Sequence, residues 1–367
     1  MRLTLLLGGA ALALAIAIPA DAQRGGGRPE LVASFPDQVT GVAVTETGRT
    51  FVNFPRWTND VPTSVAEVLP NGSIRPYPDA RWNGWRNANK NGLDPATHFV
   101  CVQSVVADGR GGLWVVDPGA PNAEKVVPGA PKLIKIDLAT NQVVQVIRFD
   151  EYVAPAASYM NDVRFSADGR HAFLTDSGAQ GALIVVDLAS GTARRVLDGH
   201  PSTQIERDVT VTLDGKPLRR PDGRGPEFAS DGIAVSPDGY VHYQALTGKT
   251  LYRVPVAVLT DPTASLYLIE RAVERVGENR VADAIWWSKA GAFYSTAPED
   301  YAVRVRGADG VMRPFVTDRR LRWPDSLAEG PDGSLYVTAS HIQDSAWFKP
   351  GAGPRLKTEL YRIAVRP

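Results

Sequence analysis

The sequence predicts an all-β fold, a six-bladed β-propeller whose ring is closed by an N-terminal strand that pairs in the last blade. Three observations support this prediction: six segments share one spacing, strand-like segments follow each of them, and nothing between them resembles a linker. Two β-sandwich domains are the competing fold. Six equal intervals are hard to obtain from sandwiches, so the repetition favours the propeller.

Each repeat opens on a polar residue, continues as a short apolar strand and reaches a turn glycine eight positions later. The glycine, usually within Asp-Gly, predicts a hairpin that joins the first two strands of each repeat. The opening residues are Thr40, Gln103, Asn161, Asp231, Asp283 and Asp325.

The second strand of each repeat is rich in β-branched and aromatic residues that alternate with smaller or polar ones, as half-buried antiparallel strands do. A third strand follows after a polar loop in every repeat, and a fourth follows in most of them. The expected second strands are residues 51–54, 113–117, 172–176, 240–244, 292–296 and 335–339. The expected third strands are residues 64–69, 132–138, 182–188, 250–256, 301–307 and 359–365.

The last repeat ends directly after its third strand and therefore lacks a fourth. Residues 30–35 precede the first repeat, in the position that a fourth strand occupies before the other repeats. We expect them to pair with residues 359–365, because this pairing covers two exposed sheet edges. The propeller domain is then residues 30–367, and residues 23–29 are expected to form a flexible tail.

Residues 1–22 have the pattern of a cleaved export signal: Arg2, an apolar run, and the small residues Ala20 and Ala22 around Asp21. The apolar run is shorter than the roughly 20 residues that span a bilayer, which argues against the alternative of an uncleaved anchor. We therefore expect a secreted or periplasmic protein that makes no membrane contact after cleavage.

The charge balance argues against a nucleic-acid partner. The chain has 40 Lys and Arg residues against 40 Asp and Glu residues, and no basic run stands out. Cys101 is the single cysteine, so it cannot form an internal disulfide, and its apolar neighbours indicate burial.

In a propeller the residue that opens the first strand points at the mouth of the central channel, so the six opening residues should form one ring. Three carboxylates and the carboxamides are hard oxygen ligands, which suit calcium or another divalent cation, with Asn161, Asp231, Asp283 and Asp325 as the candidate ligands. Alternatively, each opening residue hydrogen-bonds the backbone of a neighbouring blade. Without a metal, at least one of the aspartates should have a raised pKa, because clustered carboxylates repel one another.

Loops on the same face are rich in aromatic, basic and acidic residues that could form a rim around the channel. Loop-to-loop packing explains such residues equally well. The candidate rim residues are Arg56, Trp57, Asp117, Asp176, His341 and Trp347. No nucleophile elbow, phosphate-binding loop or zinc-binding motif is present, and the five histidines are dispersed, so a Ser–His–Asp triad is not supported.

Several stretches resemble the Yellow and major royal jelly protein family. They are residues 40–44 with 54–57, residues 101–104 with 112–119, and residues 159–163 with 175–177 and 183–188. The resemblance implies an exported six-bladed propeller that binds small molecules, including biogenic amines, in its central channel. The chain departs from the insect pattern in having a single cysteine, and we expect it to be a bacterial protein.

A more distant similarity is to the gluconolactonase and regucalcin family, which binds a divalent metal at the blade openings. That family has a Glu in its first blade, where this chain has Thr40. The difference weakens the case for lactonase chemistry, although Asp325 could substitute as a ligand.

Three functions remain open. The favoured one is binding of a small aromatic amine or cyclic metabolite in the channel. The second is a metal-dependent hydrolase that acts on lactones or esters. The third is a scaffold whose face docks a protein partner.

Overall fold

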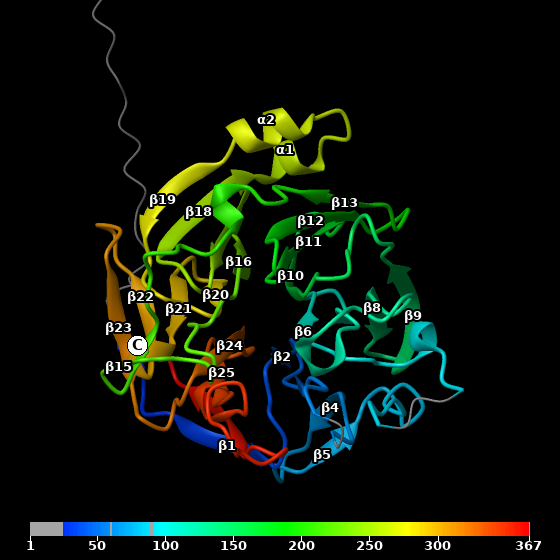
Figure 1. Ribbon diagram of the computed structural model, residues 1–367, viewed down its shortest axis with the longest axis vertical. Helices are drawn as coiled ribbons and strands as arrows, with labels where there is room; N and C mark the ends of the chain where they lie inside the picture. The colour runs from blue at the N-terminus through cyan, green and yellow to red at the C-terminus, as the bar shows by residue number, and fades with distance from the viewer. Residues whose placement is uncertain (1–24, 59–60, 89–91, 367) are drawn as a thin grey trace, which may run out of the picture.

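The computed structural model describes residues 25–58, 61–88 and 92–366. The predicted export signal, residues 1–22, lies outside this part of the chain. The described residues form six four-stranded antiparallel sheets arranged around a central channel (Figure 1), which confirms the predicted β-propeller.

In the first three blades the strands follow chain order from the channel outward. Blade 1 contains β2 (Val42–Val44), β3 (Thr50–Asn53), β4 (Val65–Val68) and β5 (Ile74–Pro76). Blade 2 contains β6 (Ser104–Ala107), β7 (Gly112–Asp117), β8 (Lys132–Asp137) and β9 (Gln142–Arg148). Blade 3 contains β10 (Met160–Phe165), β11 (His171–Asp176), β12 (Ala182–Asp187) and β13 (Ala193–Val196).

Blades 4 and 5 follow the same order, and the fourth strand of blade 6 comes from the N-terminal part of the chain. Blade 4 contains β16 (Ser230–Val235), β17 (Tyr240–Ala245), β18 (Thr250–Pro255) and β19 (Glu274–Glu278). Blade 5 contains β20 (Ile285–Trp287), β21 (Phe293–Ala297), β22 (Ala302–Arg306) and β23 (Met312–Thr317). Blade 6 contains β24 (Pro324–Glu329), β25 (Leu335–Ala339), β26 (Thr358–Ile363) and β1 (Glu30–Phe35).

Strand β1 pairs antiparallel with β26, from Glu30 opposite Arg362 to Phe35 opposite Thr358. The residues just before β1 also lie against the last two blades. The backbone N–H of Gly26 donates to Phe315 O at 2.8 Å, and that of Gly27 donates to Ala364 O at 2.8 Å. These hydrogen bonds place residues 26 and 27 against the sheets, and the flexible tail expected for residues 23–29 stays a prediction.

The connections contain little regular structure. Helices α1 (Val256–Thr260) and α2 (Leu266–Arg271) lie between β18 and β19, and the hairpin β14 (Thr212–Leu213) and β15 (Lys216–Pro217) lies between blades 3 and 4. The described residues also contain short 3₁₀ turns: η2 (Pro95–Thr97), η3 (Pro121–Ala123), η4 (Pro201–Thr203), η5 (Pro298–Asp300) and η6 (Ile342–Asp344). No helix within the described residues is long and apolar enough to cross a membrane.

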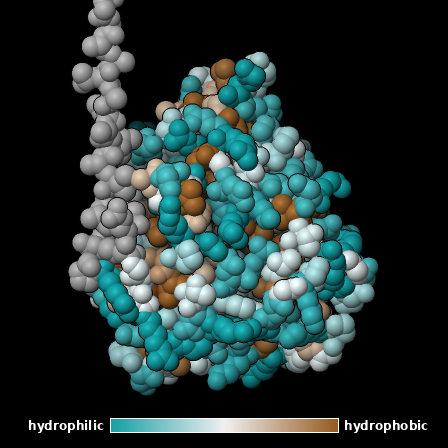
Figure 2. All heavy atoms as spheres, turned by 90° about the vertical axis from the view of Figure 1, so that its left-hand side faces the viewer, coloured by the Kyte–Doolittle hydropathy of each residue, from teal (hydrophilic) through white to brown (hydrophobic). Residues whose placement is uncertain are grey.

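Apolar side chains fill the spaces between neighbouring sheets. Between blades 2 and 3, for example, Trp114 and Val116 of β7 pack with Val163 and Leu174 of β10 and β11. The face in Figure 2 is mostly hydrophilic, with apolar atoms at the top, where the α1–α2 connection lies. Burial of the β-branched and aromatic strand residues between sheets supplies the main favourable term in folding.

Hydroxyl groups on the second strands connect one blade to the next. Thr175 Oγ1 donates to the backbone oxygen of Asp231 at 2.6 Å, and Thr338 Oγ1 donates to that of Thr40 at 2.6 Å. The backbones of neighbouring blades also approach each other closely. A Cβ added at Gly232 would lie 2.6 Å from the backbone oxygen of Asp283. Glycine at this position lets β16 and β20 approach, and it brings the residues that open these two strands together.

Candidate functional site

One cavity of about 1180 Å³ opens at the end of the channel where the inner strands begin. Five of the six predicted opening residues line it: Gln103, Asn161, Asp231, Asp283 and Asp325. Their common position on the innermost strands explains why residues from five blades converge. The predicted ring is therefore largely assembled by the fold.

Thr40 is the exception, and its assignment to the channel is wrong. The residue is fully buried and does not line the cavity. Its Oγ1 donates to Gln103 O at 2.9 Å and accepts from Asn53 Nδ2 at 2.8 Å. Thr40 therefore joins blade 1 to blade 2, which is the structural role that the sequence had left open for the opening residues.

The carboxyl groups of Asp231 and Asp283 hydrogen-bond each other across the junction of blades 4 and 5. Burial raises the pKa of Asp231 well above its ordinary value, and the charges of Asp283 and Asp325 raise it further. Burial also raises the pKa of Asp283, to about 7, although the hydrogen bonds from Trp323 and Asp231 oppose this shift. Two carboxyl groups can hydrogen-bond each other only through a proton, so the buried pair shares one.

Two neighbours fix the orientation of this pair. Asn161 Nδ2 donates to Asp231 Oδ2 at 2.9 Å, and Trp323 Nε1 donates to Asp283 Oδ2 at 2.6 Å. Each carboxyl therefore keeps one neutral donor in addition to its partner.

Asp325 completes the acidic side of the cavity. Burial raises the pKa of Asp325 well above its ordinary value, and the charge of Asp283 adds to the shift. All three channel aspartates therefore have raised pKa values.

The three channel aspartates do not by themselves form a divalent-cation site. Within the described ranges, no group of three or more His, Cys, Asp or Glu side chains is arranged so that it could hold a metal ion. The predicted ligands Asn161, Asp231, Asp283 and Asp325 do share the cavity, but Asp231 and Asp283 are hydrogen-bonded to each other. A protonated carboxyl is a poor ligand for calcium or magnesium, which favour ionised carboxylates.

Aromatic side chains form another wall of the same cavity. The rings of Trp57 and Trp347 lie 4.6 Å apart, and the ring of Phe228 lies 6.3 Å from that of Trp347. Trp57 Nε1 donates to Tyr159 Oη at 2.7 Å, and Tyr159 Oη donates to Gln103 Oε1 at 2.9 Å. The structure thus places the predicted rim residues Trp57 and Trp347 in the cavity.

Arg56 and His341 are wrong as rim residues. The Arg56 side chain is fully buried and donates to three backbone oxygens, those of Val61, Phe99 and Asn83. Burial lowers the pKa of Arg56 to about 10. His341 Nε2 lies 2.9 Å from Glu359 Oε2, and the side chain does not line the cavity.

Asp117 and Asp176 are also wrong, because hydrogen bonds occupy both carboxylates inside the fold. Asp117 accepts from Lys132 Nζ at 2.8 Å and from the backbone N–H groups of Val100, Cys101 and Gly119. Asp176 accepts from Arg195 Nη1 at 2.6 Å and from the backbone N–H of Tyr159 at 2.8 Å. Both are fully buried structural anions rather than general bases.

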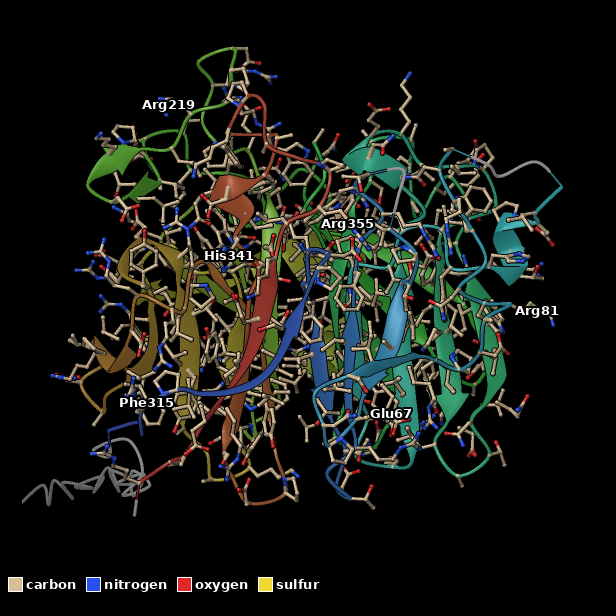
Figure 3. The ribbon with its side chains drawn as sticks, turned by 90° about the horizontal axis from the view of Figure 1, so that it is seen from below. Glu67, Arg81, Arg219, Phe315, His341 and Arg355 are labelled. Atoms are coloured by element: carbon tan, nitrogen blue, oxygen red, sulfur yellow. The ribbon has the colours of Figure 1, made fainter. Side chains whose placement is uncertain are left out.

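The predicted site residues leave out several cavity residues, among them Tyr159 and Trp323. A signal was present, since each is an aromatic residue two positions before an opening residue, Asn161 or Asp325. The basic residues Arg207, Arg220 and Arg224 also line the cavity and come from the long connection between blades 3 and 4. Nothing in the repeat pattern could have placed them. Figure 3 shows their neighbour Arg219 among the loops at one end of the sheets.

Cys101 is buried and free, as its apolar neighbours predicted. Its Sγ lies 4.0 Å from Tyr159 Oη, and burial raises the pKa of the thiol to about 12. The thiol is therefore protonated and shielded.

Comparisons with known proteins agree with the predicted resemblance. The family model described as major royal jelly protein matches residues 100–313, more than half of the chain. A Drosophila melanogaster protein named dopaminechrome tautomerase is 27% identical over 164 residues, which cover 40% of this chain. The chain spans about a third of the length of that relative, 33%.

Solved structures share the fold at low sequence identity. A calcium-binding regucalcin from Agrobacterium tumefaciens is 14% identical with a TM-score of 0.54, covering 92% of this chain and 93% of that one. A gluconolactonase from Xanthomonas campestris is 14% identical with a TM-score of 0.55, covering 95% of this chain and 93% of that one.

Proposed function

The chain belongs to the major royal jelly protein family, and on that premise we propose that its channel cavity binds a small aromatic or cyclic amine. The observation that carries the proposal is the pairing of an aromatic wall with an acidic wall in one cavity. Trp57, Trp347 and Phe228 offer ring faces, while Asp231 and Asp283 offer carboxyl groups. An aromatic amine uses both walls at once.

The raised pKa values explain how the acidic wall selects a cation. Without a ligand the buried pair shares a proton, because burial raises the pKa values of both carboxyl groups. A bound ammonium group supplies a compensating positive charge, favours the ionised carboxylates and releases a proton. A neutral ligand of the same shape provides no such compensation and loses this part of the binding free energy.

Titration calorimetry with a matched ligand pair tests the proposal. Tryptamine carries an ammonium group, and tryptophol carries a hydroxyl on the same indole scaffold. We expect tryptamine to bind at least about tenfold more tightly, the difference that one charge-assisted hydrogen bond supplies. Asp231→Asn should remove this preference, whereas Asp208→Asn, which changes an exposed carboxylate, should not. Equal binding of both ligands would exclude recognition by the acidic wall.

A second candidate activity is proton transfer within the bound ligand. The supporting observation is the Asp231–Asp283 pair, in which one carboxyl can donate a proton while the other accepts one. A tautomerase, as the Drosophila melanogaster relative is named, requires a proton to be removed from one atom and delivered to another. The test is the rate at which dopaminechrome loses its visible absorbance with wild type, Asp231→Asn and Asp283→Asn. A rate that is equal in all three would eliminate this activity.

Metal-dependent hydrolysis and protein docking receive less support than small-molecule binding. Within the described residues no three His, Cys, Asp or Glu side chains are grouped to hold a metal ion, and the paired aromatic and acidic walls suit a small molecule. We further propose that the protein acts outside the cytoplasm, as members of this family generally do. Cell fractionation with an antibody against the propeller tests this location.

A further inference from the structure

Arg220 lines the same cavity but is not used by the proposed amine site. Its guanidinium carbon lies 6.0 Å from the ring centroid of Phe228 and 5.8 Å from that of Phe348. Within the described part of the chain, the guanidinium has no carboxylate at ion-pair distance, and its Nε is buried without a hydrogen-bond partner. A buried donor without a partner costs free energy, which a suitable ligand group recovers.

The neighbouring arginines differ from Arg220 in ways that single it out. Arg224 also lines the cavity, but it pairs with Asp222 at 2.8 Å and with Glu227 at 3.0 Å. Arg219 precedes Arg220 directly in the chain and does not line the cavity. Of these three arginines, Arg220 is the one that lines the cavity without an ion pair among the described residues.

We propose that Arg220 binds a carboxylate on the channel ligand, so that the ligand is an aromatic amine that also carries an acid group. The Nε and one terminal nitrogen of a guanidinium form a planar fork that matches the two oxygens of a carboxylate. The rings of Phe228 and Phe348 lie at cation–π distance from the guanidinium and limit where it can move. Both features strengthen a charge-assisted pair.

This inference rests on the proposed function, because it adds a second recognition point to the same cavity. The acidic wall would hold the ammonium group, the aromatic wall the ring, and Arg220 the carboxylate. Lys125 and Arg207 also line the cavity and add positive potential, which Glu124 and Glu227 of the same lining partly offset. The three features together match the zwitterion of an aromatic amino acid or a cyclised derivative of one.

Two ligand pairs that differ only in the carboxylate test the assignment: L-tryptophan against tryptamine, and L-dopa against dopamine. Titration calorimetry on the wild-type protein should give at least about tenfold tighter binding of the carboxylated member of each pair. Arg220→Met keeps much of the packing on the two rings and removes the charge, so it should abolish this difference. Arg219→Met is the matched control and should preserve it.

A further variant separates the effect of the charge from that of the geometry. It also keeps the test usable if Arg220→Met fails to fold. Arg220→Lys retains the positive charge without the fork, so it should keep only part of the difference. Equal affinity of the wild type for tryptophan and tryptamine would overturn the carboxylate site while leaving the amine proposal intact. Absence of binding by all four ligands would overturn both proposals.

Discussion

Asp231 and Asp283 open the inner strands of adjacent blades, and the carboxyl group of one donates a hydrogen bond to the other. The close approach that this requires depends on Gly232, where a Cβ would meet the backbone oxygen of Asp283. The acid pair is thus a product of how blades 4 and 5 pack. Its properties can be tested through stability as well as through binding.

Asp283→Asn should change the pH dependence of stability. The pKa of Asp283 is raised to about 7 in the folded protein from an ordinary 3.8. Protonated Asp283 therefore stabilises the fold fully below the ordinary pKa of 3.8, and this stabilisation is lost as the pH rises through the raised pKa of about 7. We expect the variant to raise the melting temperature at about pH 8 by several degrees and to match the wild type only below about pH 4. An identical gain at both pH values would contradict the raised pKa.

Amine binding should strengthen as the pH rises. Below neutrality an ammonium ligand must displace the proton of Asp283, whereas above it the carboxylate is already ionised. The affinity for tryptamine should therefore increase several-fold between about pH 6 and pH 8, with proton release visible as a buffer-dependent calorimetric enthalpy. In Asp283→Asn the affinity should be nearly independent of pH, and a slope that persisted there would assign the titration to another group.

Trp347→Ala should weaken binding of aromatic ligands without unfolding the propeller. The ring of Trp347 contacts those of Trp57 and Phe228 at the cavity wall, so its loss removes a stacking surface worth about 1 kcal/mol or more. Fluorescence titration with tryptamine measures the effect. Tyr152→Ala, which removes an aromatic ring that is 82% exposed, is the control and should bind normally.

Asp117→Ala should destabilise the fold by about 3–5 kcal/mol, because it leaves the fully buried ammonium of Lys132 without its counter-ion. Denaturant unfolding measures this loss. The double variant Asp117→Ala/Lys132→Met removes both charges and should recover part of it. If Asp117→Ala instead lost ligand binding with unchanged stability, Asp117 would belong to the binding site.

Gly232→Ala should both destabilise the protein and disturb the acid pair. The added methyl group would lie 2.6 Å from the backbone oxygen of Asp283, so β16 and β20 must move apart, at a cost of about 1–3 kcal/mol. The matched control is Gly25→Ala, because an added Cβ there meets nothing within 4 Å. The melting temperature and the affinity for tryptamine should both fall in Gly232→Ala. Neither quantity should change in Gly25→Ala.

The fold could be predicted because its signal is local and repeated. The eight-residue interval from Asp231 to Gly239 fixes a hairpin, and six such hairpins specify the blades and the direction of their opening residues. Five opening residues therefore reached the cavity as predicted. Thr40 did not, since its neighbours in space are the backbone of Gln103 and the side chain of Asn53, which no local pattern reveals.

The rim was harder to predict because a loop residue's role depends on its partners. Arg56, Asp117 and Asp176 have the composition of a binding rim but satisfy buried backbone groups and ion pairs. Arg220 lies in a connection outside the repeat, so its position over Phe228 followed from neither spacing nor composition. Charge and polarity alone do not separate ligand-facing residues from those that hold loops together.

The pairing of β1 with β26 has a consequence for how the chain folds. Arg362 Nη1 contacts Glu30 Oε2 across 332 positions of sequence, so the sixth sheet joins segments from nearly opposite ends of the propeller. Contacts between residues this far apart in the sequence form late in folding, and they make folding slow. Blades 1 to 5 can be built in order as the polypeptide emerges, but the sixth sheet cannot be completed until residues 358–363 are available. Until then β1 is an unpaired edge, the segment on which a chaperone or a premature intermolecular pairing would act.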